Sequence, residues 1–126
     1  MNQAVIGIGS NIKPRQNILA AKKVLAERFQ VLKSSSFSRT KPVGVKKQPD
    51  FINGALLIQT HLDWQELRSV LKDVEDKMGS IREGNRFGPR TIDLDLLVYN
   101  RQVVHQDVYE RDFIRKAVSK LLLDWT

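Results

Sequence analysis

Residues 51–79, FINGALLIQTHLDWQELRSVLKDVEDKMG, decide the fold that this sequence predicts. The first ten of them, residues 51–60, form a largely apolar run of strand length. Asp63 then stands where a helix N-cap is expected, with Glu66 three residues later as in a capping box. Apolar residues follow at spacings of three and four, and Gly79 is suited to end the helix with a positive φ. The stretch therefore predicts a strand followed by an amphipathic helix.

The same patterns, followed outward in both directions, place the remaining elements. Short apolar runs ended by turn residues predict strands, and helical apolar spacing predicts helices. The expected order is β-α-β-β-α-β-α, with two right-handed β-α-β units joined by a pair of neighbouring strands. It predicts an α+β fold, a ferredoxin-like α/β sandwich with helices on one face of an antiparallel sheet. The further elements are strands at 5–9, 31–39 and 91–99, helices at 14–29 and 108–123, and loops at 40–50 and 80–89.

Length and composition fit one globular domain, residues 1–126. The apolar share of 41% argues against a disordered chain, and the absence of cysteine excludes disulfides and thiolate metal sites. No apolar run is long enough to span a bilayer, and the first residues do not resemble a signal peptide. We therefore expect a soluble cytoplasmic protein. Its net charge of +7 favours an anionic partner such as a nucleotide or a nucleic acid.

The strongest chemical signal is a pair of aspartates in the last predicted strand. Residues two apart in a strand point to the same side, so Asp93 and Asp95 should share one face. The alternate residues Leu94, Leu96 and Val98 should then face the core. Two neighbouring carboxylates repel each other unless a cation lies between them, and hard oxygen ligands suit Mg²⁺. The pair predicts a Mg²⁺ site, with a merely solvated strand face as the alternative.

Three arginines precede the aspartates. Arg82, Arg86 and Arg90 recur every four residues, but two glycines and a proline between them argue against a continuous helix. The arginines are therefore expected on a loop that leads into the aspartate strand. Cations beside a Mg²⁺ site supply the charge neutralisation that phosphoryl transfer requires. A P-loop enzyme is excluded, because no Gly-x-x-x-x-Gly-Lys-Ser/Thr sequence is present.

Residues 87–97, Phe-Gly-Pro-Arg-Thr-Ile-Asp-Leu-Asp-Leu-Leu, resemble the signature of the 6-hydroxymethyl-7,8-dihydropterin pyrophosphokinase family of folate biosynthesis. The resemblance covers about residues 4–99 in register. Three other parts of the chain agree with it: Ile-Gly-Ser-Asn at 8–11, Ser-Ser-Phe-Ser-Arg-Thr at 35–40 followed by Pro-Val-Gly at 42–44, and Gln-Pro-Asp-Phe-Ile-Asn at 48–53.

The resemblance implies transfer of the β,γ-diphosphate of ATP to the hydroxymethyl oxygen of a reduced pterin, with release of AMP. It implies that Asp93 and Asp95 bind two Mg²⁺ ions, which bridge the triphosphate and activate the attacking hydroxyl. For Lys72 and Glu75, which share a helix stripe, a solvated helix face is the alternative. The implied catalytic residues are Arg82, Arg90, Asp93 and Asp95, and the implied ATP contacts are Lys72, Glu75, Arg82, Arg86, Arg90, Leu96 and Arg111.

The implied pterin site combines aromatic rings with an amide. Two rings hold a flat heterocycle well, here Phe87 on one side and Phe51 or Phe113 on the other. The amide of Asn53 offers a donor and an acceptor to the amide-like edge of the pterin. Core positions are the alternative for Phe51 and Phe113. The implied pterin contacts are Thr40, Pro42, Val43, Gly44, Phe51, Asn53, Phe87 and Phe113.

The sequence also departs from the family pattern. Ser80 stands in place of an arginine, Phe87 in place of a tryptophan and Lys41 in place of a proline. The carboxyl-terminal segment is short and lacks a Pro-His pair, although residues 111–113 resemble the family's Arg-x-Phe. These departures leave open a homologue that binds pterin and nucleotide but has lost turnover or changed substrate.

A second alternative is an RNA-binding ferredoxin-like module, which would suit the basic charge. No strand carries the Lys/Arg-Gly-Phe/Tyr-Gly/Ala-Phe-Val motif, so nucleic acid is the less favoured partner. No membrane partner is expected, and the sequence does not indicate an oligomeric state. His61 and His105 are expected to be solvated surface residues.

Overall fold

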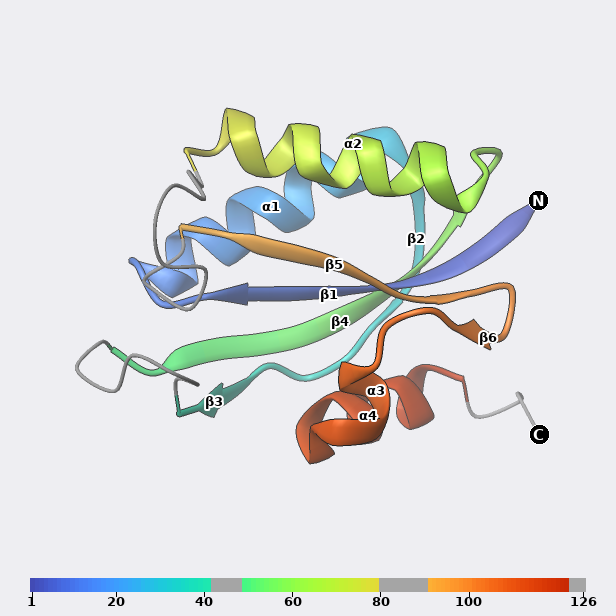
Figure 1. Cartoon of the computed structure of the whole chain (residues 1–126). Coiled ribbons are helices and arrows are strands. Elements are labelled where there is room, and N and C mark those ends of the chain that lie inside the picture. The colour runs from blue at the N-terminus through green and yellow to red at the C-terminus, as the bar shows by residue number, and fades with distance from the viewer. Residues whose placement is uncertain (42–48, 80–90, 123–126) are drawn as a thin grey trace.

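A computed structural model describes residues 1–41, 49–79 and 91–122 of the chain. In these residues a six-stranded sheet lies between two layers of helices (Figure 1). The strands follow the order β2-β4-β1-β5-β6, β3 also pairs with β4, and every pairing is antiparallel. The strands are β1 Asn2–Ser10, β2 Gln30–Ser34, β3 Ser38–Thr40, β4 Phe51–Thr60, β5 Asp93–Tyr99 and β6 Gln102–Val103.

The central strand order β2-β4-β1-β5 comes from two crossovers on one face of the sheet. Helix α1 (Pro14–Arg28) connects β1 to β2, and helix α2 (Trp64–Lys77) connects β4 to β5. Both helices lie on the same side of the sheet (Figure 1). This arrangement confirms the predicted α+β class with an antiparallel sheet, and its strand order is that of a ferredoxin-like sandwich.

Helix α2 begins and ends where the sequence predicts. The Asp63 carboxylate accepts a hydrogen bond from the Glu66 backbone N–H at 2.8 Å, and Glu66 Oε1 accepts one from the Asp63 N–H at 3.1 Å. This reciprocal capping box satisfies two backbone donors that the helix itself leaves unpaired. Gly79, with φ of 84°, follows the helix. Trp64, in contrast, starts the predicted apolar stripe but is exposed on the surface.

The larger core fills the space between the sheet and the two crossover helices. Its side chains come from alternate positions of the central strands and from one stripe of each helix, as the apolar spacing predicts. Its fully buried members include Ile6, Ile8, Leu25, Ile58, Leu67 and Ile92.

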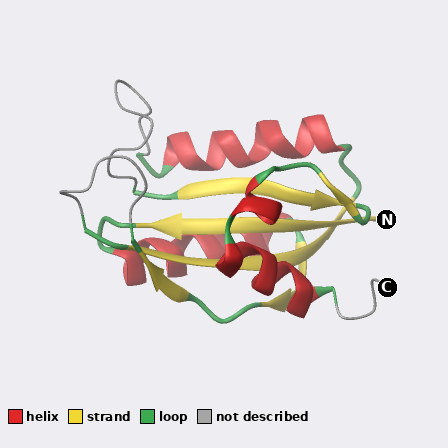
Figure 2. Ribbon diagram, turned by 60° about the horizontal axis from the view of Figure 1, so that its bottom comes forward, coloured by secondary structure: helices red, strands yellow, loops and turns green. Residues whose placement is uncertain are grey.

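The opposite face of the sheet is covered as well. Two short helices, α3 (Asp107–Glu110) and α4 (Asp112–Leu121), lie across it, and Figure 2 shows them in front of the strands. Val118 and Leu121 of α4 are buried in a second core cluster with Val5 of β1 and residues of β4 and β5. The expectation of helices on one face was therefore incomplete, because the last helical segment returns to the other face.

The helix predicted over 108–123 is broken at Arg111. This residue has an extended backbone, with φ of −120° and ψ of 114°, and it separates α3 from α4. Its carbonyl accepts hydrogen bonds from the Ile114 and Arg115 N–H groups, so it acts as the N-cap of α4. No glycine or proline marks this position, which is why the sequence pattern predicted one continuous helix.

The strand predicted over 31–39 is also interrupted. Between Ser34 and Ser38 the chain advances four residues while its partner β4 advances three, from Leu56 to Asn53. The side chain of Ser35 bridges this irregularity, because its hydroxyl accepts a hydrogen bond from the Ala55 N–H at 2.8 Å. The result is two strands, β2 and β3, where one was expected.

A bulge and a tight turn change the end of β5. The register against β1 shifts after the Ile6–Leu96 pair, so Leu97 and Val98 both belong to the second core cluster. The expectation that Val98 faces the same side as Leu96 was therefore wrong. Asn100 and Arg101 have φ of 46° and 69°, and they form a two-residue turn into the additional strand β6.

Candidate active site

Two cavities flank β5 and share the carboxylate of Asp95. The first cavity, of about 490 Å³, lies on the face covered by α4, and β1, β4, β5 and α4 line it. The second cavity, of about 560 Å³, lies between α2, β5 and the segment that follows β6. Asp95 therefore stands in the wall between two spaces, each large enough for a small organic ligand.

The floor of the first cavity is made by glycines of β1. Gly9 pairs with Asp93 on one side and with Asn53 on the other, and Gly7 pairs with Asp95. Because these glycines have no side chains, a flat strip of backbone separates the side-chain amide of Asn53 on β4 from the two carboxylates on β5. A Cβ atom at Gly9 would lie 2.3 Å from Asn53 Oδ1, so only glycine fits there without displacing the amide.

Asp93 and Asp95 are half-buried and point to the same side of β5, as predicted. No group of three or more His, Cys, Asp or Glu side chains in the described ranges is arranged to hold a metal ion. Two carboxylates without a third protein ligand fit Mg²⁺, which keeps several water ligands and takes others from substrate phosphates. The donor set of this strand therefore suits a Mg²⁺–nucleotide complex.

Asn53 is held in place by its neighbours. Its Nδ2 donates a hydrogen bond to the Thr40 hydroxyl on β3, and its Oδ1 lies over Gly9. The structure thus brings together two residues that the sequence predicted for the pterin site. A fixed amide at the edge of a flat cavity is suited to recognise the polar edge of a planar ring.

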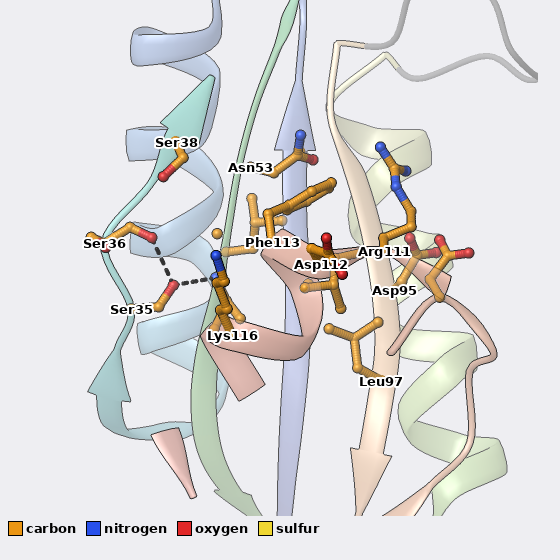
Figure 3. A pocket seen from close by; sticks show the side chains of 18 of the residues that line it. Ser35, Ser36, Ser38, Asn53, Asp95, Leu97, Arg111, Asp112, Phe113 and Lys116 are labelled. Carbon is orange, nitrogen blue, oxygen red and sulfur yellow. Dashed lines mark hydrogen bonds between the residues drawn. The ribbon is translucent and has the colours of Figure 1, made fainter. Parts of the chain in front are cut away.

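Phe113 and Arg111 enter the first cavity from the segment that crosses the sheet. In Figure 3 the Phe113 ring lies between the Asn53 amide on one side and Arg111 and Asp95 on the other. The guanidinium of Arg111 lies over the Phe113 ring, 4.6 Å from its centre. Phe113 thus borders the cavity, whereas Phe51, at the start of β4, is not among its lining residues.

The second cavity has charged walls. Lys72 and Glu75 of α2 line it together with Leu96 of β5, so three predicted nucleotide contacts meet there. Glu75 is 2% exposed, and its carboxylate accepts a hydrogen bond from the Leu94 N–H at 2.7 Å. The alternative of a solvated helix face was therefore wrong for Glu75, whereas Lys72 is exposed. Arg111, also predicted to contact ATP, lines the first cavity instead.

Comparison with known proteins places this arrangement in a family. The family model described as 7,8-dihydro-6-hydroxymethylpterin-pyrophosphokinase matches residues 5–122. The chain belongs to this family. It is 33% identical over 135 residues to the 2-amino-4-hydroxy-6-hydroxymethyldihydropteridine pyrophosphokinase of Haemophilus influenzae, covering 98% of this chain and 84% of that protein. It is 37% identical over 131 residues to the Bacillus subtilis protein of the same name, covering 95% of this chain and 78% of that protein.

A longer relative is also similar. The folate synthesis bifunctional protein of Arabidopsis thaliana is 35% identical over 130 residues, which cover 95% of this chain and 27% of that protein. The similarity therefore involves a limited part of a larger polypeptide.

Several residues predicted for the pyrophosphokinase site lie outside the described residues. Three of them belong to the predicted pterin contacts, and two, Arg82 and Arg90, were expected to be catalytic. The full set is Pro42, Val43, Gly44, Arg82, Arg86, Phe87 and Arg90.

One residue beside the pyrophosphokinase carboxylates was misjudged from the sequence. His105 was expected to be a solvated surface residue, but its side chain is 33% exposed and its Nε2 lies 4.0 Å from Asp95 Oδ1. The turn at Asn100 and Arg101 pairs β6 with β5, and this hairpin returns the chain to Asp95. An asparagine between two apolar runs is a hairpin signal that could have located His105.

Proposed function

We propose that this member of the pyrophosphokinase family transfers the β,γ-diphosphate of ATP to 6-hydroxymethyl-7,8-dihydropterin in folate biosynthesis. The hydroxymethyl oxygen attacks the β-phosphorus of ATP and loses its proton. The bond from the β-phosphorus to the α,β-bridging oxygen breaks, and AMP leaves with that oxygen. The products are AMP and the pterin diphosphate.

The observation that carries this proposal is the position of Asp95 in the wall between the two cavities. A transfer between two bound substrates requires that their reacting atoms meet at one place. A planar substrate in the first cavity and a nucleotide in the second would both approach this carboxylate. The family relation supports the same pair of substrates.

Asp93 and Asp95 are the residues that would hold two Mg²⁺ ions. Bound Mg²⁺ would neutralise charge on the triphosphate and favour loss of the hydroxyl proton. In this proposal Arg82 and Arg90 add positive charge near the transferred group, and Arg86 contacts the nucleotide.

The pterin is assigned to the first cavity. The Asn53 amide would pair with its polar edge, and the Phe113 ring would stack on its plane once Arg111 moves off the ring face. Thr40 holds the amide in the required orientation. The remaining proposed pterin contacts are Phe87, residues 42–44 and Phe51, although Phe51 is not among the residues that line the first cavity.

The nucleotide is assigned to the second cavity. Lys72 offers a positive charge to the phosphates, and Leu96 offers an apolar surface. Glu75 acts from its buried position by fixing β5, and Arg111 reaches the nucleotide from the neighbouring cavity.

The cytoplasm is the compartment that we propose, because a chain without cysteine needs no oxidising environment and ATP is the co-substrate. None of the described helices is long and apolar enough to cross a membrane. Nucleic acid is not a proposed partner, since the two carboxylates would repel a phosphate backbone that arrives without metal.

The test is product analysis with the purified full chain. ATP, Mg²⁺ and 6-hydroxymethyl-7,8-dihydropterin should yield AMP and pterin diphosphate in equal amounts, measured by ³¹P NMR and chromatography. Omission of the pterin, or addition of a chelator, should stop AMP release. Formation of ADP, or AMP release that does not depend on the pterin, would contradict the proposal.

A further inference from the structure

The lining of the first cavity is divided by charge. Four carboxylates line it from β5, α3 and the start of α4, whereas two lysines line it from further along α4. Figure 3 shows Asp95 on one side of the Phe113 ring and Lys116 on the other side, toward Ser35 and Ser36. The carboxylates belong to Asp93, Asp95, Asp107 and Asp112, and the lysines are Lys116 and Lys120. The cavity therefore has an acidic end and a basic end.

The basic end is built by α4 and by the interruption between β2 and β3. Lys116 and Lys120 are four residues apart, so they project from the same side of α4. Neither ammonium group forms an ion pair with a carboxylate in the described part of the chain. The Ser35 hydroxyl donates to the Ser36 carbonyl at 2.9 Å and fixes this wall, while Ser36 and Ser38 bring further hydroxyl groups to it. Ammonium and hydroxyl donors that line one space are suited to bind an oxyanion.

The proposed reaction turns a neutral ligand of this cavity into an anion. The hydroxymethyl pterin is an uncharged alcohol, whereas its diphosphate ester carries several negative charges. In the absence of metal, the carboxylates of Asp93 and Asp95 repel this diphosphate because like charges lie close together. The lysines at the basic end attract it, and a cleft concentrates such a field. The two ends of the cavity therefore act on the product in opposite ways, and they leave the neutral substrate almost unaffected.

We propose that the basic end of the first cavity is a subsite for the diphosphate group of the pterin product. The ring stays beside the Asn53 amide, and the diphosphate turns from the β5 carboxylates toward Lys116 and Lys120. No covalent bond forms or breaks in this movement. The subsite thus draws the product away from the place where the next nucleotide must bind. This inference rests on the proposed function, because it takes the pterin diphosphate to be the product.

Calorimetric titration of the full chain in the presence of a chelator tests the subsite without turnover. Synthetic 6-hydroxymethyl-7,8-dihydropterin diphosphate is compared with the uncharged alcohol. At low ionic strength we expect the wild type to bind the diphosphate about tenfold more tightly than the alcohol. Added salt should reduce this preference, because both lysines are exposed and their charges are screened. Equal affinity of the wild type for the two ligands would overturn the inference.

Charge substitutions assign the preference to the basic end. The double variant K116Q/K120Q should bind the diphosphate no more than about twofold more tightly than the alcohol, with its affinity for the alcohol unchanged. K116R/K120R keeps both charges and should keep the preference. K23Q/K33Q is the matched control, because it removes the same total charge from exposed positions on α1 and β2 that do not line the cavity. An unchanged preference in K116Q/K120Q, or an equal loss in K23Q/K33Q, would overturn the inference.

Circular dichroism and thermal unfolding of each variant check the fold. The wild-type comparison of diphosphate and alcohol keeps the inference falsifiable even if K116Q/K120Q fails to fold. Product analysis keeps the two proposals apart. AMP release by the wild type with an unchanged preference in K116Q/K120Q contradicts this inference alone. Absent AMP release with the expected binding contrast contradicts the proposed function alone, because the contrast is measured with synthetic diphosphate.

Discussion

The two cavities beside Asp95 are built in different ways. The first cavity has a floor of strand backbone, where Gly7 and Gly9 lie between the Asn53 amide and the carboxylates. The second cavity has walls of long charged side chains from α2, among them Lys72. A flat floor selects a planar ligand by shape, and it tolerates almost no added atoms. Flexible charged walls attract an anion, and they tolerate substitution better because each charge contributes little alone.

A change at the shared wall should have the largest effect, because it reaches both cavities. Asp95→Ala should lower turnover by about 10³-fold or more. Without this carboxylate the proposed Mg²⁺ would be held less well, and the negative charge on the phosphates would be less stabilised in the transition state. Asp95 is outside both core clusters, so the melting temperature of the variant should be close to that of the wild type. Steady-state AMP release and thermal unfolding measure the two effects. Turnover within tenfold of the wild type would remove Asp95 from the metal site.

A change in the floor should affect the pterin alone. Gly9→Ala places a Cβ atom 2.3 Å from Asn53 Oδ1. We expect the KM for the pterin to rise about tenfold and the free energy of unfolding to fall by about 1–3 kcal/mol, because the backbone or the amide must shift. The KM for ATP should stay the same.

Gly7→Ala is the matched control for the floor. Its Cβ would lie 3.0 Å from Leu97 Cδ1, which is the end of a flexible side chain. It should therefore raise the pterin KM less than Gly9→Ala does. An equal rise in the pterin KM for both variants would show that displacement of the Asn53 amide does not cause the effect of Gly9→Ala.

A change in the charged wall should have a smaller effect and act on ATP. Lys72→Ala should raise the KM for ATP about fivefold, which is about 1 kcal/mol, because an exposed cation contributes little. Lys77→Ala, on the same helix but outside the second cavity and paired with Asp73, should leave it unchanged. A rise in the pterin KM with Lys72→Ala would contradict the division between the cavities.

A change remote from both cavities should affect stability and not catalysis. The Tyr99 hydroxyl donates to the Leu62 carbonyl at 2.8 Å, and burial, with Asp63 and Glu66 nearby, raises the pKa of Tyr99 above 10.0. Tyr99→Phe should lower the free energy of unfolding by about 1 kcal/mol at neutral pH.

The pH dependence of that difference has a definite sign. The folded state keeps the Tyr99 proton to higher pH than the unfolded state, so the wild type loses stability as pH rises above about 10. Chemical denaturation at pH 7 and above pH 10 should show the wild type losing more stability than Tyr99→Phe. A constant difference in the free energy of unfolding between the wild type and Tyr99→Phe across this range would contradict the raised pKa of Tyr99.

Local chemistry made part of this molecule predictable. The N-cap at Asp63, the alternation of Asp93 and Asp95 and the strand at β4 depend on residues close together in the sequence. The Gly9–Asn53 pair joins β1 to β4, and both residues lie in segments, 8–11 and 48–53, that agree with the family resemblance.

The rest depended on tertiary structure. The break at Arg111 leaves no sequence signal, yet it allows α4 to cover the second face of the sheet. The bulge after Leu96 turns Val98 to the side opposite the predicted one, because register within a sheet is set by the packing of both faces. His105 lies near Asp95 because of the register in which β6 pairs with β5, and this register cannot be predicted from the types of the individual residues.

The hydrogen bond from the Leu94 N–H to the buried Glu75 carboxylate has a mechanical consequence. Leu94 lies between the two aspartates, so the helix that borders the nucleotide cavity is tied directly to the backbone that carries the proposed metal ligands. Any rotation of α2 as a nucleotide enters would be transmitted to the strand through this link. The helix and the carboxylates would then move as one rigid unit and keep their spacing constant.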